Sequence, residues 1–165
     1  MKRNKWFNDA NIYGVPGFVR LFTYIKEVSE IIGEEKAWEI LEEITTRKRL
    51  EWLEKNEKKL RNLKGDIIGQ AYKIFYQEYL KLNPKDVEIV EKTMNRLVMR
   101  WYNFCPVLEA CKILGLDTRE VCKRVYDSSV QAFLEKINPK LKFKRNYQKI
   151  RPYAKYCEEI IILEE

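Results

Sequence analysis

The sequence predicts an α+β fold, in which a helical N-terminal half precedes a ββααββ unit that forms a four-stranded antiparallel sheet covered by helices. Apolar residues recur every three or four positions in the first half, which is typical of amphipathic helices. They alternate with polar residues over 86–93 and 96–104, which indicates a β-hairpin. Because the chain has 165 residues, we expect a single domain over 1–165, with a helical part over 1–84 and a cysteine-containing ββααββ part over 85–165.

The first half is predicted to contain three helical stretches. Apolar residues over 18–32 line one face of a helix that we expect Gly33 to end. Residues 34–63 carry dense charge between apolar positions and predict either one long helix or two. Asp66 is a good N-cap for a further helix, which continues to about residue 79. The first half therefore predicts helices joined by short connections.

The second half adds two helices and two strands to the hairpin. A Cys-Pro pair opens a short helix over 107–114, with the proline in the first-turn position that it favours. Asp117 is placed to cap an amphipathic helix whose apolar face runs over 121–137. Residues 141–147 alternate between apolar and polar, and residues 156–163 form an apolar, β-branched run. We expect these two segments to be the third and fourth strands of the sheet.

The absence of histidine limits the chemistry that this chain can perform. The chain has no histidine, 32 Lys and Arg, and 25 Asp and Glu, for a net charge of +7. Ser-His-Asp and Cys-His catalytic arrangements are thereby excluded, as are zinc and haem held by histidine. No apolar run approaches the ~20 residues of a membrane span, and no secretory leader is evident. We therefore expect a cytoplasmic protein without a membrane partner.

Four cysteines are the main candidates for chemistry: Cys105, Cys111, Cys122 and Cys157. Cys105 is predicted to be the N-cap of a helix, where backbone N–H groups and the positive helix end favour a thiolate. A thiolate there would be a nucleophile or a metal ligand. The alternatives are a buried apolar cysteine and, given a composition rich in Lys and Glu that is typical of thermophiles, a structural disulfide. No Cys-x-x-Cys pair occurs, but four thiolates are the right number for a metal or iron–sulfur centre.

A basic segment near the C-terminus is the candidate for anion binding. Residues 136–155 contain eight Lys and Arg, interleaved with aromatic residues, and no acid. Such a segment suits phosphates and stacked bases. It also suits a small carboxylate, which Arg145 or Arg151 could hold with two parallel hydrogen bonds. The commoner role of such a segment in a lysine-rich protein is a solvated surface, which we favour over anion binding.

Two stretches of the second half resemble a known family. The first is RWYNFCPVLEACKILGLDTREVC, over residues 100–122, and the second runs from LKFKR at 141–145 to IRPYAKYCEEII at 150–161. Their order of strand, Cys-Pro, helix, Gly-Leu, helix with cysteine and final-strand cysteine resembles the core of the L-2-amino-thiazoline-4-carboxylic acid hydrolase family. The resemblance covers about residues 85–165 and implies hydrolytic opening of a cyclic amidine thioether. Members of that family are also similar to vinyl-reductase-type small-molecule-binding domains, many of which bind without turnover.

Three hypotheses of function follow, and because of the resemblance the first is the predicted function. In the first, Cys105 attacks a small cyclic amidine carboxylate and Glu109, one helical turn later, moves protons, although a solvated carboxylate is the commoner role. Under this hypothesis Arg100 or Arg145 holds the substrate's carboxylate and Tyr126 contacts the substrate.

In the second hypothesis, the four cysteines hold a metal or iron–sulfur centre, or line a ligand pocket, without turnover. In the third, which we favour least, the basic C-terminal hairpin binds nucleic acid. The expected partner is thus a small anionic molecule, and the helical half is compatible with a homodimer.

Overall fold

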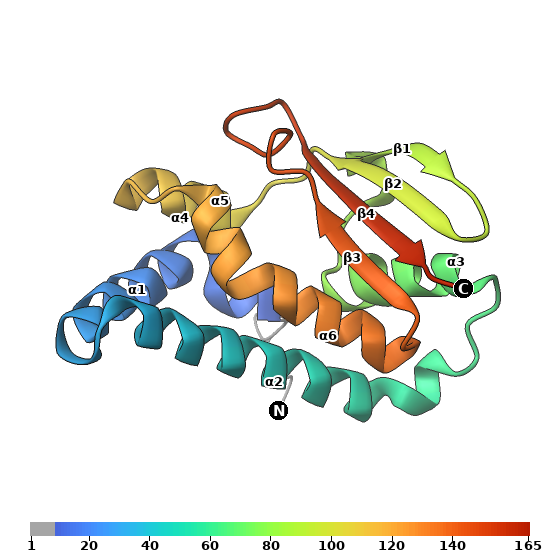
Figure 1. Cartoon of the computed structure of the whole chain (residues 1–165), viewed down its shortest axis with the longest axis horizontal. Coiled ribbons are helices and arrows are strands. Elements are labelled where there is room, and N and C mark those ends of the chain that lie inside the picture. The colour runs from blue at the N-terminus through green and yellow to red at the C-terminus, as the bar shows by residue number, and fades with distance from the viewer. Residues whose placement is uncertain (1–8) are drawn as a thin grey trace, which may run out of the picture.

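The computed structural model describes residues 9–165, with side chains described from residue 14 onward (Figure 1). Its helical first half is followed by four strands and the helices between them, as expected. The elements in chain order are α1 (Asp9–Ile32), α2 (Glu34–Leu60), α3 (Ile67–Tyr72), the π-helix η1 (Lys73–Tyr79), the 3₁₀ turn η2 (Pro84–Asp86), β1 (Val87–Lys92), β2 (Arg96–Trp101), α4 (Pro106–Leu114), α5 (Thr118–Val121), the π-helix η3 (Cys122–Asp127), α6 (Ser128–Ile137), β3 (Leu141–Arg145) and β4 (Cys157–Leu163).

The four strands form an antiparallel sheet in the order β1-β2-β4-β3. The last strand in sequence therefore lies in the interior of the sheet, between the hairpin and β3. Trp101 at the end of β2 is opposite Cys157 at the start of β4, and Arg145 at the end of β3 is opposite Glu159. Because both neighbours run antiparallel to β4, the last residues of β2 and of β3 and the first residues of β4 lie side by side at one end of the strands.

The helix ends follow the sequence signals closely. Gly33 and Gly115 both have positive φ angles, of 91° and 65°, and separate consecutive helices. Asp66 accepts a hydrogen bond from the backbone N–H of Gly69 at 2.6 Å, and Asp117 accepts one from Arg119 at 2.8 Å. The aspartate side chains accept hydrogen bonds from backbone N–H groups that are unpaired at the start of a helix, and the glycines adopt the positive φ angles at which a helix ends. Because both effects involve residues a few positions apart, the local sequence predicts the helix ends well.

The segment 34–63 contains one long helix, α2, which is one of the two predicted alternatives. Two features of the helices differ from the sequence prediction. The helical stretch α1 begins at Asp9, before the predicted residue 18, but its backbone is not helical at Gly14 (φ 32°, ψ −177°), where the stretch has a kink. Two of the predicted helices also contain π-helical segments, η1 and η3. A π segment inserts an extra residue in a turn, and no residue type in these stretches announces it, so it depends on tertiary packing.

Two clusters of buried side chains form the core. One lies between the inner face of the sheet and the helices α2, η1 and α6, and it includes Phe75, Met99 and Phe133. The other joins α1, α2, α4 and η3, and it includes Phe22 and Trp38. The long helix α2 contributes residues to both clusters. In Figure 1, α6 lies between α2 and β3. Within residues 9–165, no helix is both long enough and apolar enough to cross a bilayer.

Candidate functional site

A cavity of about 810 Å³ lies between the two core clusters. Its walls come from α1, α2, η1, the end of the sheet where β2 ends and β4 starts, and the helices α4 to η3. Most of its wall is apolar or aromatic. Among the residues that line it, Ile40, Ile44, Lys48 and Phe104 are exposed, so they mark where the cavity opens to solvent. The size and the apolar lining are typical of a site for a small organic molecule.

Both π-helical segments contribute to this cavity. Phe75, Tyr76 and Tyr79 come from η1, and Cys122 and Tyr126 come from η3. A π segment changes the direction of the side chains that follow it, and such segments occur frequently at functional sites. The two local irregularities in the helical framework are therefore located at the cavity.

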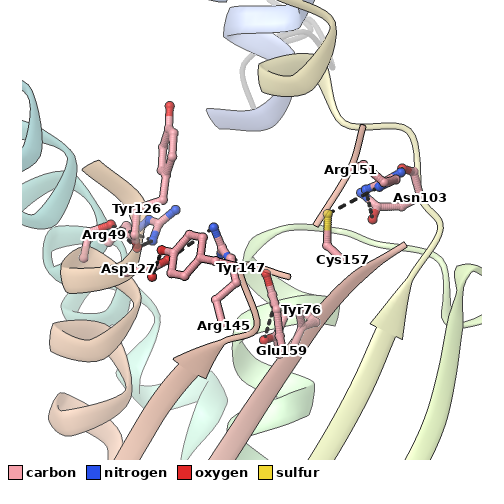
Figure 2. A network of polar contacts seen from close by, with 11 residues as sticks. Arg49, Tyr76, Asn103, Tyr126, Asp127, Arg145, Tyr147, Arg151, Cys157 and Glu159 are labelled. Atoms are coloured by element: carbon pink, nitrogen blue, oxygen red, sulfur yellow. Dashed lines mark hydrogen bonds and ion pairs between the residues drawn. The ribbon is translucent and has the colours of Figure 1, made fainter. Parts of the chain in front are cut away.

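A buried polar network closes the side of the cavity next to the sheet (Figure 2). Arg145, whose side chain is 8% exposed, contacts Glu159 at 2.8 Å and Asp127 at 3.2 Å. The hydroxyl of Tyr76 donates to Glu159 at 2.7 Å, and the hydroxyl of Tyr147 donates to Asp127. Burial raises the pKa of the Asp127 carboxyl despite the nearby Arg145. The charge of Arg145 is thus matched by two carboxylates of the protein itself.

A second buried arginine, Arg49, lines the same cavity from α2. It is 7% exposed, and its Nη1 donates to the Ser129 hydroxyl at 2.8 Å and to the Tyr126 carbonyl at 3.4 Å. The guanidinium carbon lies 5.4–5.9 Å from the ring centroids of Phe75, Tyr79 and Tyr126, within the range of cation–π attraction. No carboxylate oxygen among residues 14–165 lies within ion-pair distance of Arg49.

The structure separates the four cysteines. Cys105, Cys122 and Cys157 line the cavity, whereas Cys111 is buried in the α1–α2–α4 core cluster. All four are free thiols. In the described part of the chain, no three cysteine, aspartate or glutamate side chains converge on a point that could hold a metal ion. The structure therefore gives no support to a metal or iron–sulfur centre held by all four cysteines, because Cys111 lies in a core cluster and the other three line the cavity.

The thiolate expected at Cys105 is also not favoured. Cys105 is the N-cap of α4, as predicted. However, burial raises the pKa of its thiol, and the hydrogen bond from the Leu108 backbone and the charge of Arg151 only partly oppose this shift. Burial likewise raises the pKa of Cys122 to about 12. At an N-cap, the helix dipole favours the anion, but here the cost of desolvating the anion is larger.

Two predicted site residues lie away from the cavity. Glu109 is half-exposed on α4 and forms an ion pair with Lys112 at 2.9 Å. Arg100 lies on the opposite face of β2 from Trp101, where it contacts Glu158 at 3.1 Å. Neither residue lines the cavity that Cys105 lines. The predicted pairing of Cys105 with Glu109, and the role of Arg100 as a substrate clamp in this cavity, therefore lack a geometric basis.

The other two predicted binding residues do reach the cavity. Arg145 and Tyr126 both line it. In Figure 2 the Tyr126 ring projects away from the Asp127–Arg145 pair, and burial raises the pKa of its hydroxyl. Arg151 also lines the cavity, but its guanidinium donates to the Asn103 carbonyl at 2.5 Å and to Cys157 Sγ at 3.4 Å. Arg145 and Arg151 are therefore already engaged by the protein.

The basic segment 136–155 does not form one continuous cationic surface. Arg145 is buried, Lys142 pairs with Glu135, and Lys149 pairs with Glu158. Acids from other segments thus neutralise cations that look unpaired in the sequence. A solvated, internally paired surface describes most of this segment.

Sequence reasoning missed Arg49 and the position of Trp101 in the cavity wall. Arg49 lies on the same helical stripe as Leu41 and Leu53, eight residues after the first and four before the second. A charged residue between apolar positions at this spacing was the signal that the sequence offered. Trp101 was assigned to the core, which is correct in part because it is 3% exposed. However, it also lines the cavity, and its indole N–H has no acceptor among the described residues.

Comparison of the chain with models of known protein families, with curated proteins and with solved structures found no significant match in any of the three. The resemblance described above therefore stays a prediction.

Proposed function

We propose that this protein is a small-molecule-binding module whose ligand occupies the cavity between its two core clusters. The observation that carries the proposal is a cavity of about 810 Å³ whose lining is mostly apolar and aromatic, with a few buried polar groups. Apolar surface of this kind gains free energy when a ligand replaces the water in contact with it. The few buried donors would orient the ligand, as in most sites of this size.

A cavity-filling substitution tests the proposal. The neutral probe N-phenyl-1-naphthylamine fluoresces in apolar surroundings, and we expect wild-type protein to bind it saturably. Thr45→Trp places a large ring in the cavity, since Thr45 lines it, and we expect the affinity for the probe to fall at least about tenfold. The neighbouring Thr46→Trp is the matched control, because Thr46 lies on the same helix and does not line this cavity.

The result is read against protein stability. Both variants should unfold cooperatively, as measured by circular dichroism in urea. An absence of saturable binding by the wild-type protein, or equal loss of binding in both variants, would contradict the proposal.

A second candidate function is hydrolysis of a small cyclic amidine carboxylate. The observation that favours it is that Cys105 lines the cavity at the start of α4. In this scheme the Cys105 thiolate adds to the ring carbon between nitrogen and sulfur, the ring C–N bond breaks, and water releases the product. The raised thiol pKa makes the thiolate a minor species at neutral pH.

The pH dependence of turnover tests this second function. With L-2-amino-thiazoline-4-carboxylic acid as substrate, product formation should rise steadily from neutral to alkaline pH, because the reactive thiolate forms only as pH approaches the raised pKa. Cys105→Ala should abolish turnover, whereas Cys111→Ala should keep it, since Cys111 does not line the cavity. Absence of product from wild-type protein at alkaline pH would leave only the binding function.

A further inference from the structure

We propose that Arg49 is the receptor for the anionic head of the ligand, and that the ligand is an amphipathic monocarboxylate, such as a fatty acid. This inference rests on the binding function proposed above, and it adds the chemical class of the ligand and the residue that selects it.

The first support is the contrast between the two buried arginines of the cavity. Arg145 contacts Asp127 and Glu159, so its charge is matched within the protein. Arg49 is also buried but has no carboxylate of residues 14–165 within ion-pair distance. The Nε of each arginine is buried without a hydrogen-bond acceptor among the described residues, so the missing carboxylate is what distinguishes Arg49. Burying a cation without an anion is costly. An anionic ligand would supply the missing partner.

The second support is the surroundings of the Arg49 guanidinium. Three aromatic rings, from Phe75, Tyr79 and Tyr126, lie around it, and Nη1 is held by Ser129 and by the Tyr126 carbonyl. Figure 2 shows the side chain reaching from α2 to the segment that carries Tyr126 and Asp127. These contacts fix the orientation of the guanidinium but leave Nε and Nη2 without an acceptor among the described residues. A carboxylate can accept from two guanidinium nitrogens at once.

The third support is a further donor in the same wall. The Trp101 indole N–H is buried and lacks an acceptor among the described residues. The rings of Trp101 and Tyr76 are stacked, with their centroids 4.8 Å apart. Tyr76 in turn packs edge-on against Phe75, which is one of the three rings around Arg49. Arg145 Nε is also buried without an acceptor among the described residues, so three residues that line this cavity carry an unsatisfied buried donor. Such donors call for a ligand that carries acceptors. The remaining apolar wall calls for a ligand with an apolar body, and one unmatched arginine calls for one negative charge.

The main alternative is that Arg49 serves only as a distant counter-charge for Asp127. Arg49 does lower the pKa of Asp127, but it is the last and smallest of the influences on that carboxyl. Asp127 makes its direct contacts with Arg145 and Tyr147 instead. The contacts therefore favour an external anion at Arg49.

Competition with the neutral fluorescent probe tests the inference. Dodecanoate and dodecanol share one apolar chain and differ in the carboxylate, so each is used to displace N-phenyl-1-naphthylamine from wild-type protein. We expect dodecanoate to bind about tenfold to a hundredfold more tightly than dodecanol, as is typical of a charge-assisted hydrogen bond. In Arg49→Met, dodecanoate should lose this advantage while dodecanol and the probe bind as before.

Control variants separate Arg49 from the general positive charge of the surface. Arg47→Met removes an exposed arginine of the same helix, and Lys48→Met removes the lysine at the cavity mouth; both should keep the preference for dodecanoate. Equal displacement by the acid and the alcohol in wild-type protein overturns the inference even if Arg49→Met does not fold. Loss of the preference in Lys48→Met and not in Arg49→Met also overturns it. If the probe itself does not bind, the proposed function fails first.

Discussion

Replacing Arg145 with methionine is expected to lower the free energy of unfolding by about 3–5 kcal/mol. The substitution removes the cation between Glu159 and Asp127 and leaves two carboxylates close together in a site where the arginine side chain is only 8% exposed. An uncompensated buried charge must either stay desolvated or take up a proton, and both cost free energy. Urea denaturation of the variant at neutral pH measures the loss.

Arg96→Met is the matched control for this prediction. Arg96 also lies on a strand and pairs with a carboxylate, Glu91 at 3.2 Å, but both partners are exposed. Its loss should change stability by about 1 kcal/mol or less. A second comparison adds Glu159→Gln to Arg145→Met, which should recover part of the stability because one of the two stranded charges is removed. A loss from Arg145→Met no larger than that from Arg96→Met would contradict the role of Arg145 as an internal counter-charge.

Replacing Phe133 with alanine is expected to cost a similar amount, about 3–5 kcal/mol. Phe133 on α6 is 0% exposed. The centroid of its ring lies 5.0 Å from that of Phe75, 5.3 Å from that of Tyr79 and 6.2 Å from that of Trp52. Removing it leaves a void where α2, η1 and α6 meet. Thermal and urea unfolding give the size of the loss.

The same substitution should weaken ligand binding. Phe75 and Tyr79 surround Arg49, so the loss of the ring behind them loosens the wall of the cavity. We expect the affinity of N-phenyl-1-naphthylamine to fall along with stability. Phe104→Ala is the control for stability, because Phe104 is 70% exposed and buries little apolar surface. Phe133→Ala with wild-type stability would show that this aromatic cluster does not hold the helices together.

The chemistry of the cavity favours recognition of a ligand over attack on it. Burial raises the pKa of Cys105 and Cys122, and the carboxylate expected to assist Cys105 is paired with Lys112 outside the cavity. A binding site needs a cavity of suitable size and a few polar groups, and this cavity has about 810 Å³ and buried donors. A thiol nucleophile needs in addition a base or a cation that lowers its pKa. Arg151 is a cation that lowers the pKa of the Cys105 thiol, but burial raises this pKa by more.

Sequence alone determined the order of the secondary structure and most of its boundaries. The hairpin, the third and fourth strands, the Asp66 and Asp117 caps and the glycine ends at 33 and 115 were all predicted and are confirmed. These features depend on interactions between residues a few positions apart, such as a cap with the next turn or the alternation of a strand. Such interactions can be read from one chain without knowledge of its packing.

Only the tertiary structure decided which polar residues form the site. Arg49 meets Ser129 across 80 residues, and Tyr76 meets Glu159 across 83. The same long-range packing buried Arg145 beside two acids, paired Glu109 away from the cavity and separated Cys111 from the other thiols. Burial decides whether a charge is solvated, paired or left without a partner, and burial is set by how helices pack on the sheet. Local sequence periodicity does not contain that information, so the candidate ligand site became visible only in the folded chain.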